Sequence, residues 1–254
     1  MITSSQNPKI KLVRALSGRS KERREAGAFV VEGVRLVEEA VISNWGFQFA
    51  LYDDSLSERG KSLIESLKSR GIETEEVSSN IMKSLSETET PQGILAVLKL
   101  DQLTIPKLLD FVLIPDLIRE PGNLGTLLRS AAAAGVQAVF LPPEIADAFA
   151  PKVVRAGMGA HFRLPIHTMS WDEIEQHTED LQIYLADMDG QSCWETDLKK
   201  PLALIIGGEA EGASEQARKL ANTKISIPMM GKMESLNAGV AGSVLMFEVM
   251  RQRK

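Results

Sequence analysis

The sequence predicts an α/β protein that is divided into two domains. Short apolar segments rich in β-branched residues alternate with amphipathic helical segments along most of the chain. The segment 202–206 is continuously apolar, as expected for a strand buried in a parallel sheet. A polar connector at 99–106 divides the pattern. We therefore expect one domain at 1–98, a linker at 99–106 and a second domain at 107–254, which suits a chain of 254 residues.

The first domain opens with a helical pattern between residues 4 and 16, where Ile10, Val13 and Leu16 recur near helical spacing. Ser4 or Ser5 is the candidate capping residue. Further along, apolar runs indicate strands, amphipathic runs indicate helices, and glycine or a Pro-Gln-Gly turn separates them. The expected elements are a strand at 28–31, a helix at 34–42, a strand at 47–51, a helix at 58–69 and a strand at 94–98.

The second domain repeats this alternation of strands and helices. The expected elements are a strand at 111–114, a helix at 124–134, a strand at 136–141, a helix at 151–157, strands at 181–186 and 202–206, a helix at 214–220, a strand at 225–227 and a final helix at 238–251. This order favours a mainly parallel sheet with helices on both faces. Ligands bind such sheets in the loops beyond the carboxyl ends of the strands.

The charge is unevenly distributed. The net charge is −5, but residues 1–25 carry +5 and the remaining residues carry −10. A basic arm on an acidic body favours contact with phosphates, although a solvated helix face would have the same composition. The candidate RNA-binding residues are Lys9, Lys11, Arg23, Arg24 and Arg35.

Several classes of protein are disfavoured. No apolar stretch approaches 18 residues, and the amino terminus lacks the apolar core of a secretory signal, so we expect no membrane segment. Cys193 is the single cysteine, which excludes an internal disulfide and favours a cytoplasmic location. The three histidines show no ligand spacing with Cys193, and we expect no metal site.

The loop after the strand at 111–114 contains the first candidate functional residues. Pro121 and Gly122 form a turn, and Asn123 is placed to cap the following helix. Arg129 follows Asn123 by six residues, about one and two-thirds helical turns. On this loop alone, Asn123 as a simple cap and Arg129 as a surface charge remain an alternative interpretation.

The loop after the strand at 202–206 is rich in glycine and glutamate. It has neither the G-x-G-x-x-G spacing of a dinucleotide site nor the ending of a P-loop, which disfavours a nucleotide-dependent oxidoreductase. This loop contains two carboxylates, Glu209 and Glu211, which would repel a bound phosphate. A cofactor with positive charge, such as the sulfonium of S-adenosyl-L-methionine, suits this loop better. The alternative is an acidic turn that favours the start of a helix.

The loop after the strand at 225–227 combines soft apolar and capping residues. Met229, Met230 and Met233 offer a surface for an adenine ring, although core packing would explain them equally well. Ser235 and Asn237 precede a final helix that begins with small residues, so another backbone can approach it closely.

Taken together, the three loops resemble the motifs of the SpoU (TrmH-like) family of RNA ribose methyltransferases, within the SPOUT superfamily. The resemblance covers roughly residues 107–254. Its matching positions are Asn123, Gly125 and Arg129; Gly207, Glu209 and Gly212; Ile227 to Met229; and Ser235 to Asn237. Ala210 and the pair Ala238-Gly239 depart from residues that are common in the family.

The resemblance implies a C-terminal SPOUT fold with a parallel sheet and a trefoil knot, S-adenosyl-L-methionine as the methyl donor, and a homodimer. It makes Arg129 the central catalytic residue, as an orienting and charge-stabilising group because arginine stays protonated. The other implied catalytic residues are Asn123, Glu209, Ser235 and Asn237. The implied cofactor-binding residues are Gly207, Ile227, Met229, Leu236 and Asn237.

The first domain also has a family resemblance. The segments 7–16, 29–40 and 90–97 resemble the RNA-binding domain of the ribosomal-RNA branch, which is similar in fold to small ribosomal proteins. The expected function is therefore methyl transfer from S-adenosylmethionine to a ribose 2′-hydroxyl of ribosomal RNA. A transfer-RNA ribose methyltransferase and a noncatalytic RNA-binding protein are the alternatives.

Overall fold

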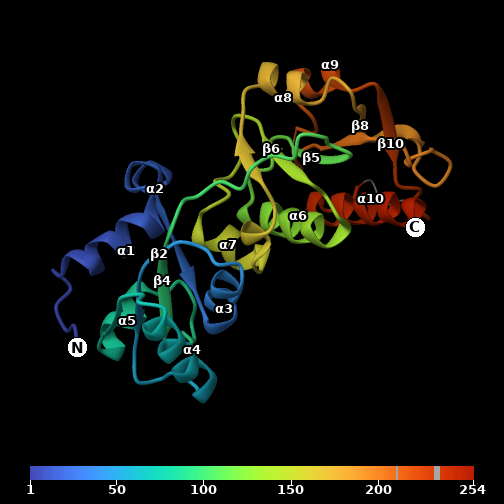
Figure 1. Ribbon diagram of the computed structural model, residues 1–254. Helices are drawn as coiled ribbons and strands as arrows, with labels where there is room; N and C mark the ends of the chain where they lie inside the picture. Colours follow the sequence, from blue (N-terminus) through green and yellow to red (C-terminus); the bar gives the residue numbers. More distant parts are fainter. Residues whose placement is uncertain (210, 232–234) are drawn as a thin grey trace. The chain divides into compact units, whose positions relative to one another are not determined.

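Two separate β-sheets organise the chain in the computed structural model, and helices pack against both (Figure 1). The structure describes residues 1–209, 211–231 and 235–254. One unit contains Met1–Asp101 and Phe149–Phe162, and the second contains Gln102–Ala148 and Arg163–Lys254. The chain therefore passes from one unit to the other at residues 101/102, 148/149 and 162/163.

The first unit holds a four-stranded sheet in the order β1-β4-β2-β3. The strand β4 pairs antiparallel with β1 and β2, whereas β3 pairs parallel with β2. Its elements are α1 (Pro8–Gly18), α2 (Ser20–Ala26), β1 (Ala28–Glu32), α3 (Val34–Ile42), β2 (Phe47–Tyr52), α4 (Glu58–Ser69), β3 (Thr74–Glu76), α5 (Ser79–Leu85), β4 (Ile94–Lys99), α7 (Pro151–Gly157) and the 3₁₀ turn η1 (Ala160–Phe162).

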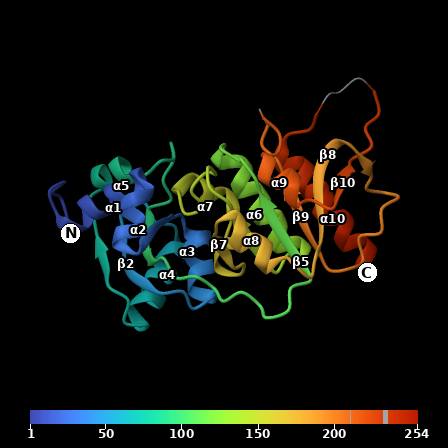
Figure 2. The ribbon, with the colours of Figure 1, turned by 90° about the horizontal axis from the view of Figure 1, so that it is seen from above.

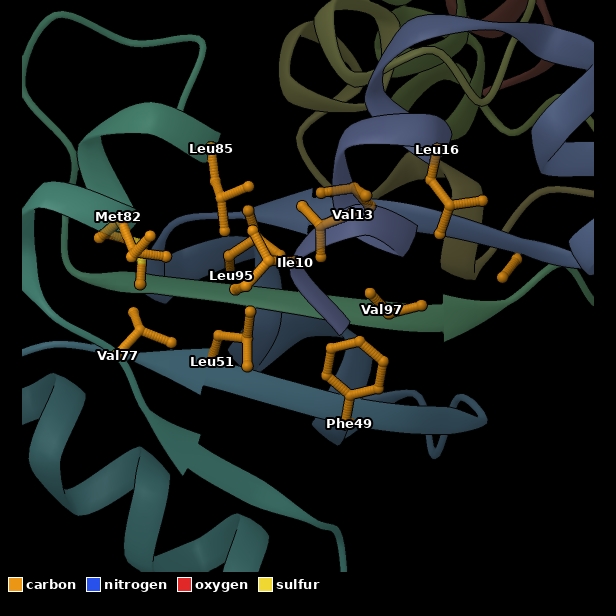
Figure 3. Close-up of a cluster of buried hydrophobic side chains, with 13 residues drawn as sticks. Ile10, Val13, Leu16, Phe49, Leu51, Val77, Met82, Leu85, Leu95 and Val97 are labelled. Carbon is orange, nitrogen blue, oxygen red and sulfur yellow. The ribbon is translucent and has the colours of Figure 1, made fainter. Parts of the chain in front are cut away.

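The helix α1 packs on one face of this sheet through the apolar stripe seen in the sequence. Figure 3 shows Ile10, Val13 and Leu16 of α1 directed at side chains from β2 and β4, with Met82 and Leu85 of α5 alongside. The helix begins at Pro8 rather than at residue 4, and Asn7 rather than a serine accepts the capping hydrogen bond, from the Lys9 N–H at 2.9 Å. Proline suits the first helical position because its missing N–H would be unpaired there anyway.

The segment Phe149–Phe162 belongs to the first unit although it lies far along the chain. The Phe149 ring lies 5.1 Å from that of Phe29, and the Phe162 ring lies 5.3 Å from that of Trp45. The predicted division at 99–106 did not anticipate this excursion, because periodicity identifies a helix but not the core on which it packs.

The second unit contains a six-stranded sheet in the order β10-β8-β9-β5-β6-β7, and every pair is parallel. The predicted α/β class with a parallel sheet is confirmed. Its elements are β5 (Phe111–Pro115), α6 (Pro121–Ala134), β6 (Ala138–Leu141), β7 (Ile166–Thr168), α8 (Trp171–His177), β8 (Gln182–Ser192), β9 (Leu202–Ile206), α9 (Glu215–Leu220), β10 (Thr223–Ser226) and α10 (Ala238–Arg253). The trefoil knot implied by the resemblance stays a prediction.

Helices cover both faces of this sheet. Figure 1 shows α8 and α9 on one side of the strands and α6 and α10 on the other. Alternate residues of the strands pack with Ile174 of α8 and Ala217 of α9. On the opposite face α6 and α10 lie side by side, also in the view of Figure 2. A Cβ at Gly242 would lie 2.3 Å from the Leu127 side chain, so the small residues of α10 permit the close approach predicted for them.

In the part of the chain that the structure describes, no helix is long and apolar enough to cross a bilayer.

Candidate cofactor and catalytic site

A pocket of about 640 Å³ opens at the carboxyl ends of β9 and β10, beside residues 186–188 of β8, at the edge where a parallel sheet places its ligands. Its size is that of a typical small-molecule site. It is lined mainly by the ends of those strands, the loops that follow β9 and β10, and the first turns of α10. The residues expected to bind the cofactor all line it: Gly207, Ile227, Met229, Leu236 and Asn237.

The loop after β9 has no room for side chains at Gly207 and Gly208. A Cβ at Gly207 would lie 2.7 Å from the Ala213 nitrogen, and one at Gly208 would lie 2.4 Å from the Leu117 oxygen. The Gly208 N–H also donates to the Gly212 oxygen at 3.0 Å, so the loop folds back on itself. Backbone groups therefore form this wall of the pocket. Ala210 of this loop and Met233 of the next lie outside the described residues.

A side-chain network joins all three predicted loops. The Asn123 amide donates to the Glu209 carboxylate, and the Asn237 amide donates to Asn123 Oδ1 at 3.0 Å. Asn237 Oδ1 accepts from the Val240 N–H at 3.2 Å and so caps α10, as predicted. We call the three residues the Asn-Glu-Asn network. It connects Asn123 to residues that lie 86 and 114 positions further along the chain.

The predicted capping role of Asn123 is wrong. The helix α6 begins at Pro121, and Glu120 is its capping residue, accepting from the Gly122 N–H at 3.4 Å. Proline at the first helical position moves the start of the helix three residues earlier than expected. Asn123 therefore lies inside the first turn, and its side chain is available to the network.

The two carboxylates of the glycine loop have different partners. Glu209 accepts from Asn123, whereas Glu211 lies 3.4 Å from Arg119, which also lies 3.3 Å from Glu144. Both Glu209 and Glu211 line the pocket. The ion pair of Glu211 is exposed and long, so it contributes little to stability and leaves the pocket wall acidic.

A further wall of the pocket comes from an irregularity in β8 that sequence reasoning missed. Lys224 of β10 pairs with Leu185, but the next residue, Ile225, pairs with Gln191, so residues 186–190 bulge out of the ladder. A Cβ at Gly190 would lie 2.5 Å from the Ile225 nitrogen, which makes glycine necessary there. The interruption of an apolar run by Asp-Met-Asp-Gly is the signal that could have revealed it.

The bulge places Asp187 and Met188 in the pocket wall. The Asp187 carboxylate lies 2.9 Å from Lys224 Nζ and 3.2 Å from Arg218. The hydrogen bond from Lys224 lowers the pKa of Asp187, so this carboxylate stays ionised and holds the bulge to its neighbours.

The expected catalytic residues fall into two groups. Asn123, Glu209 and Asn237 meet in the Asn-Glu-Asn network, and Ser235 lines the pocket beside them. Arg129 lies on the exposed side of α6 and is not among the described residues that line the pocket. The structure of a single chain therefore does not bring Arg129 into the pocket.

The candidate RNA-binding residues also separate into two groups. Lys9 forms ion pairs with Glu73, at 2.7 Å, and with Glu75, and Arg23 is buried and donates to the Leu16 oxygen. Their charges serve contacts inside the first unit. Lys11, Arg24 and Arg35 are exposed, and Arg35 borders a second cavity of about 310 Å³ with Arg59.

Among the described residues, no group of three or more histidine, cysteine, aspartate or glutamate side chains could hold a metal ion. The single cysteine is buried, which raises the pKa of the Cys193 thiol to about 11 and leaves it unreactive at neutral pH.

Two family models match the chain. The model of the SpoU rRNA Methylase family matches residues 110–247, and that of the MRM3-like substrate binding domain matches residues 7–96.

Individual proteins resemble it over nearly their whole length. The 23S rRNA (guanosine(2553)-2′-O)-methyltransferase RlmP of Bacillus subtilis is 33% identical over 98% of this chain and 98% of its own. The 23S rRNA (uridine(2479)-2′-O)-methyltransferase of Streptomyces viridochromogenes is 31% identical over 98% of this chain and 92% of its own. The crystal structure of the SpoU methyltransferase AviRb from Streptomyces viridochromogenes, in complex with the cofactor AdoMet, is similar with a TM-score of 0.86 and 30% identity over 97% of this chain and 99% of its own.

We expect Gly207→Ala to weaken binding of S-adenosylhomocysteine by about 1–3 kcal/mol, because the new methyl group would force the loop away from Ala213. Calorimetry on the folded variant measures this. Gly18→Ala is the control, since nothing lies within 4 Å of a Cβ there. Equal affinities for the two variants would show that the close approach at Gly207 is unimportant for the pocket.

Proposed function

The chain belongs to the SpoU rRNA methylase family, and from this we propose that it transfers the methyl group of S-adenosylmethionine to a ribose 2′-hydroxyl of ribosomal RNA. The observation that carries the proposal is the pocket at the carboxyl ends of β9 and β10. Two of the family's loops line it, and Asn123 of the third is hydrogen-bonded to both of them. Relatives that match nearly the whole chain are named as 23S rRNA 2′-O-methyltransferases.

The pocket suits this cofactor better than a nucleotide with a polyphosphate. Its glycine loop presents backbone groups together with Glu209 and Glu211, which favour a sulfonium and repel phosphates. Met229 and Leu236 offer apolar surface to an adenine ring, and Gly207, Ile227 and Asn237 supply backbone and amide groups. When bound, S-adenosylmethionine supplies an electrophilic methyl group.

The residues of the chain then have to orient and activate the nucleophile. A ribose hydroxyl attacks poorly at neutral pH, so it must be aligned and relieved of its proton. We assign Arg129 to orienting the target nucleotide through its phosphate and to stabilising the charge that develops. The Asn-Glu-Asn network positions the loops around the cofactor, and Ser235 adds a hydroxyl at the pocket wall.

A second copy of the chain completes the site in this proposal. The helix α10 exposes Val240 and Phe247, with half-buried Val244 between them, along one apolar stripe. The same helix lines the pocket through Ala238, Ala241 and Leu245. A partner that covers the stripe lies close to the pocket and to Arg129 on the neighbouring α6. We therefore propose a homodimer with its active sites near the interface.

Ribosomal RNA is favoured over transfer RNA because of the N-terminal unit, which matches a substrate-binding domain. We propose that the protein acts in the cytoplasm, the compartment in which bacterial ribosomes assemble. The purified protein should transfer labelled methyl from S-adenosylmethionine to ribosomal RNA at a 2′-oxygen, and mapping of 2′-O-methyl positions would locate the target. Transfer to transfer RNA alone would establish the alternative enzyme. Binding of RNA without methyl transfer would establish the noncatalytic alternative.

We expect Arg129→Ala to lower the single-turnover rate of methyl transfer by at least about a hundredfold, the scale of a lost transition-state interaction. Binding of S-adenosylhomocysteine should change little, because Arg129 lies outside the lining of the pocket. Arg129→Lys should restore only part of the rate, since an ammonium cannot reproduce the planar guanidinium.

Sedimentation of the same samples distinguishes catalysis from assembly. If Arg129 only supports the dimer, the activity of Arg129→Ala should follow its dimer fraction. A dimeric Arg129→Ala protein with a near-normal single-turnover rate would exclude the catalytic assignment.

We expect the double variant Lys11→Glu, Arg24→Glu to bind ribosomal RNA more weakly and with a flatter salt dependence, by about 0.7–0.9 in the slope for each lost phosphate contact. Both residues are exposed. Filter binding over a range of salt measures this. Lys61→Glu, Lys68→Glu on α4 changes the charge equally and serves as the control. An equal effect of both variants would mean that net charge, not the basic arm, governs binding.

A further inference from the structure

We propose that Asp116 is a positioning residue that clamps the glycine loop of the pocket at both ends and so preforms the cofactor site. The inference rests on the proposed function of that pocket. Asp116 directly follows β5, and it is 1% exposed. Asp116 is not among the motif positions on which the family resemblance rests.

The clamp has two hydrogen bonds. The Asp116 N–H donates to the Ile206 oxygen at 2.8 Å, immediately before the loop begins at Gly207. The Asp116 carboxylate accepts from the Ser214 N–H at 2.6 Å, where the loop ends and α9 begins. One residue therefore fixes the two ends of the loop that supplies Gly207, Gly208 and Glu211 to the pocket.

The next residue, Leu117, also contacts the glycine loop. Leu117 has a φ of 54°, a left-handed conformation that is uncommon outside glycine. Its oxygen would lie 2.4 Å from a Cβ at Gly208, so the loop passes directly against it. Since strained backbone persists only where its surroundings enforce it, the pair Asp116-Leu117 is held in place to shape this loop.

Keeping a carboxylate here is costly for the fold. Burial raises the pKa of Asp116, while the bonds to Ser214 and the charge of Arg218 on α9 act against that rise, and Glu144 adds to it. A group whose pKa is raised on folding stabilises the fold at low pH and loses that contribution as pH rises through the raised pKa. The ionised carboxylate therefore costs stability at neutral pH, which is expected of a group retained for a site rather than for the core.

A preformed loop binds its ligand more tightly because its ordering entropy is lost during folding and not during binding. We expect Asp116→Ala to raise the Kd for S-adenosylhomocysteine about ten- to a hundredfold, the range of one hydrogen bond to a charged group, with a less favourable binding entropy. We expect Asp116→Asn, which keeps an acceptor oxygen without the charge, to show a smaller loss of affinity and a Tm at pH 8 no lower than that of the wild type.

Calorimetry and thermal unfolding of full-length variants test this. Asp53→Asn is the matched control, because Asp53 is also buried, directly follows β2 and accepts from the Ser55 N–H at 3.0 Å, but belongs to the first unit. It should leave the affinity unchanged. A wild-type Kd in Asp116→Ala, or parallel losses of Tm and affinity in Asp116→Asn, would overturn the clamp. If the wild type itself fails to bind S-adenosylhomocysteine, the proposed function fails instead.

Discussion

The Asn-Glu-Asn network is the interaction on which the geometry of the site depends. A parallel sheet brings the loops after β5, β9 and β10 to one edge, but proximity alone leaves their spacing undetermined. The amides of Asn123 and Asn237 and the carboxylate of Glu209 fix that spacing with directional bonds. The same bonds couple the start of α6 to the start of α10, the two helices that cover one face of the sheet. The network thus connects the helix pair to the loops that line the pocket.

Much of this could be predicted from the sequence because the signals are local. The observed bounds of the helices at 34–42 and 58–69 and of the strand at 202–206 are the ones predicted from hydrophobic periodicity and from the residues that flank each element. The loops after Ile206 and Ile227 line the pocket, since strand ends in a parallel sheet share an edge. Asn237 caps α10, as expected for an asparagine immediately before a helical run.

What could not be predicted depends on contacts between distant residues. The number of basic residues near the amino terminus placed Lys9 and Arg23 in an RNA-binding arm. In the structure Lys9 instead pairs with Glu73 and Glu75, and Arg23 donates to the Leu16 oxygen. The Asp-Met-Asp-Gly run signals an irregularity in β8, but the extent of the bulge is set by the register of β8 against β10, which neither strand encodes alone. Arg129 carries the strongest catalytic implication of the family resemblance, yet it lies on an exposed helix face, where one chain alone gives it no role.

The excursion of residues 149–162 limits how freely the two units can be exchanged. The ion pairs of Arg155 with Glu32 and Glu87, at 3.7 and 3.6 Å, add polar contacts to the aromatic packing of this segment. Truncation near residue 101 would leave the amino-terminal fragment without α7, the helix that contacts β1. The carboxyl-terminal fragment would keep residues 149–162 without the core on which their aromatic side chains pack. Joining the substrate-binding unit to a different catalytic unit, in evolution or in the laboratory, therefore requires two exchanges. Residues 149–162 must be transferred into the new catalytic unit together with the amino-terminal segment.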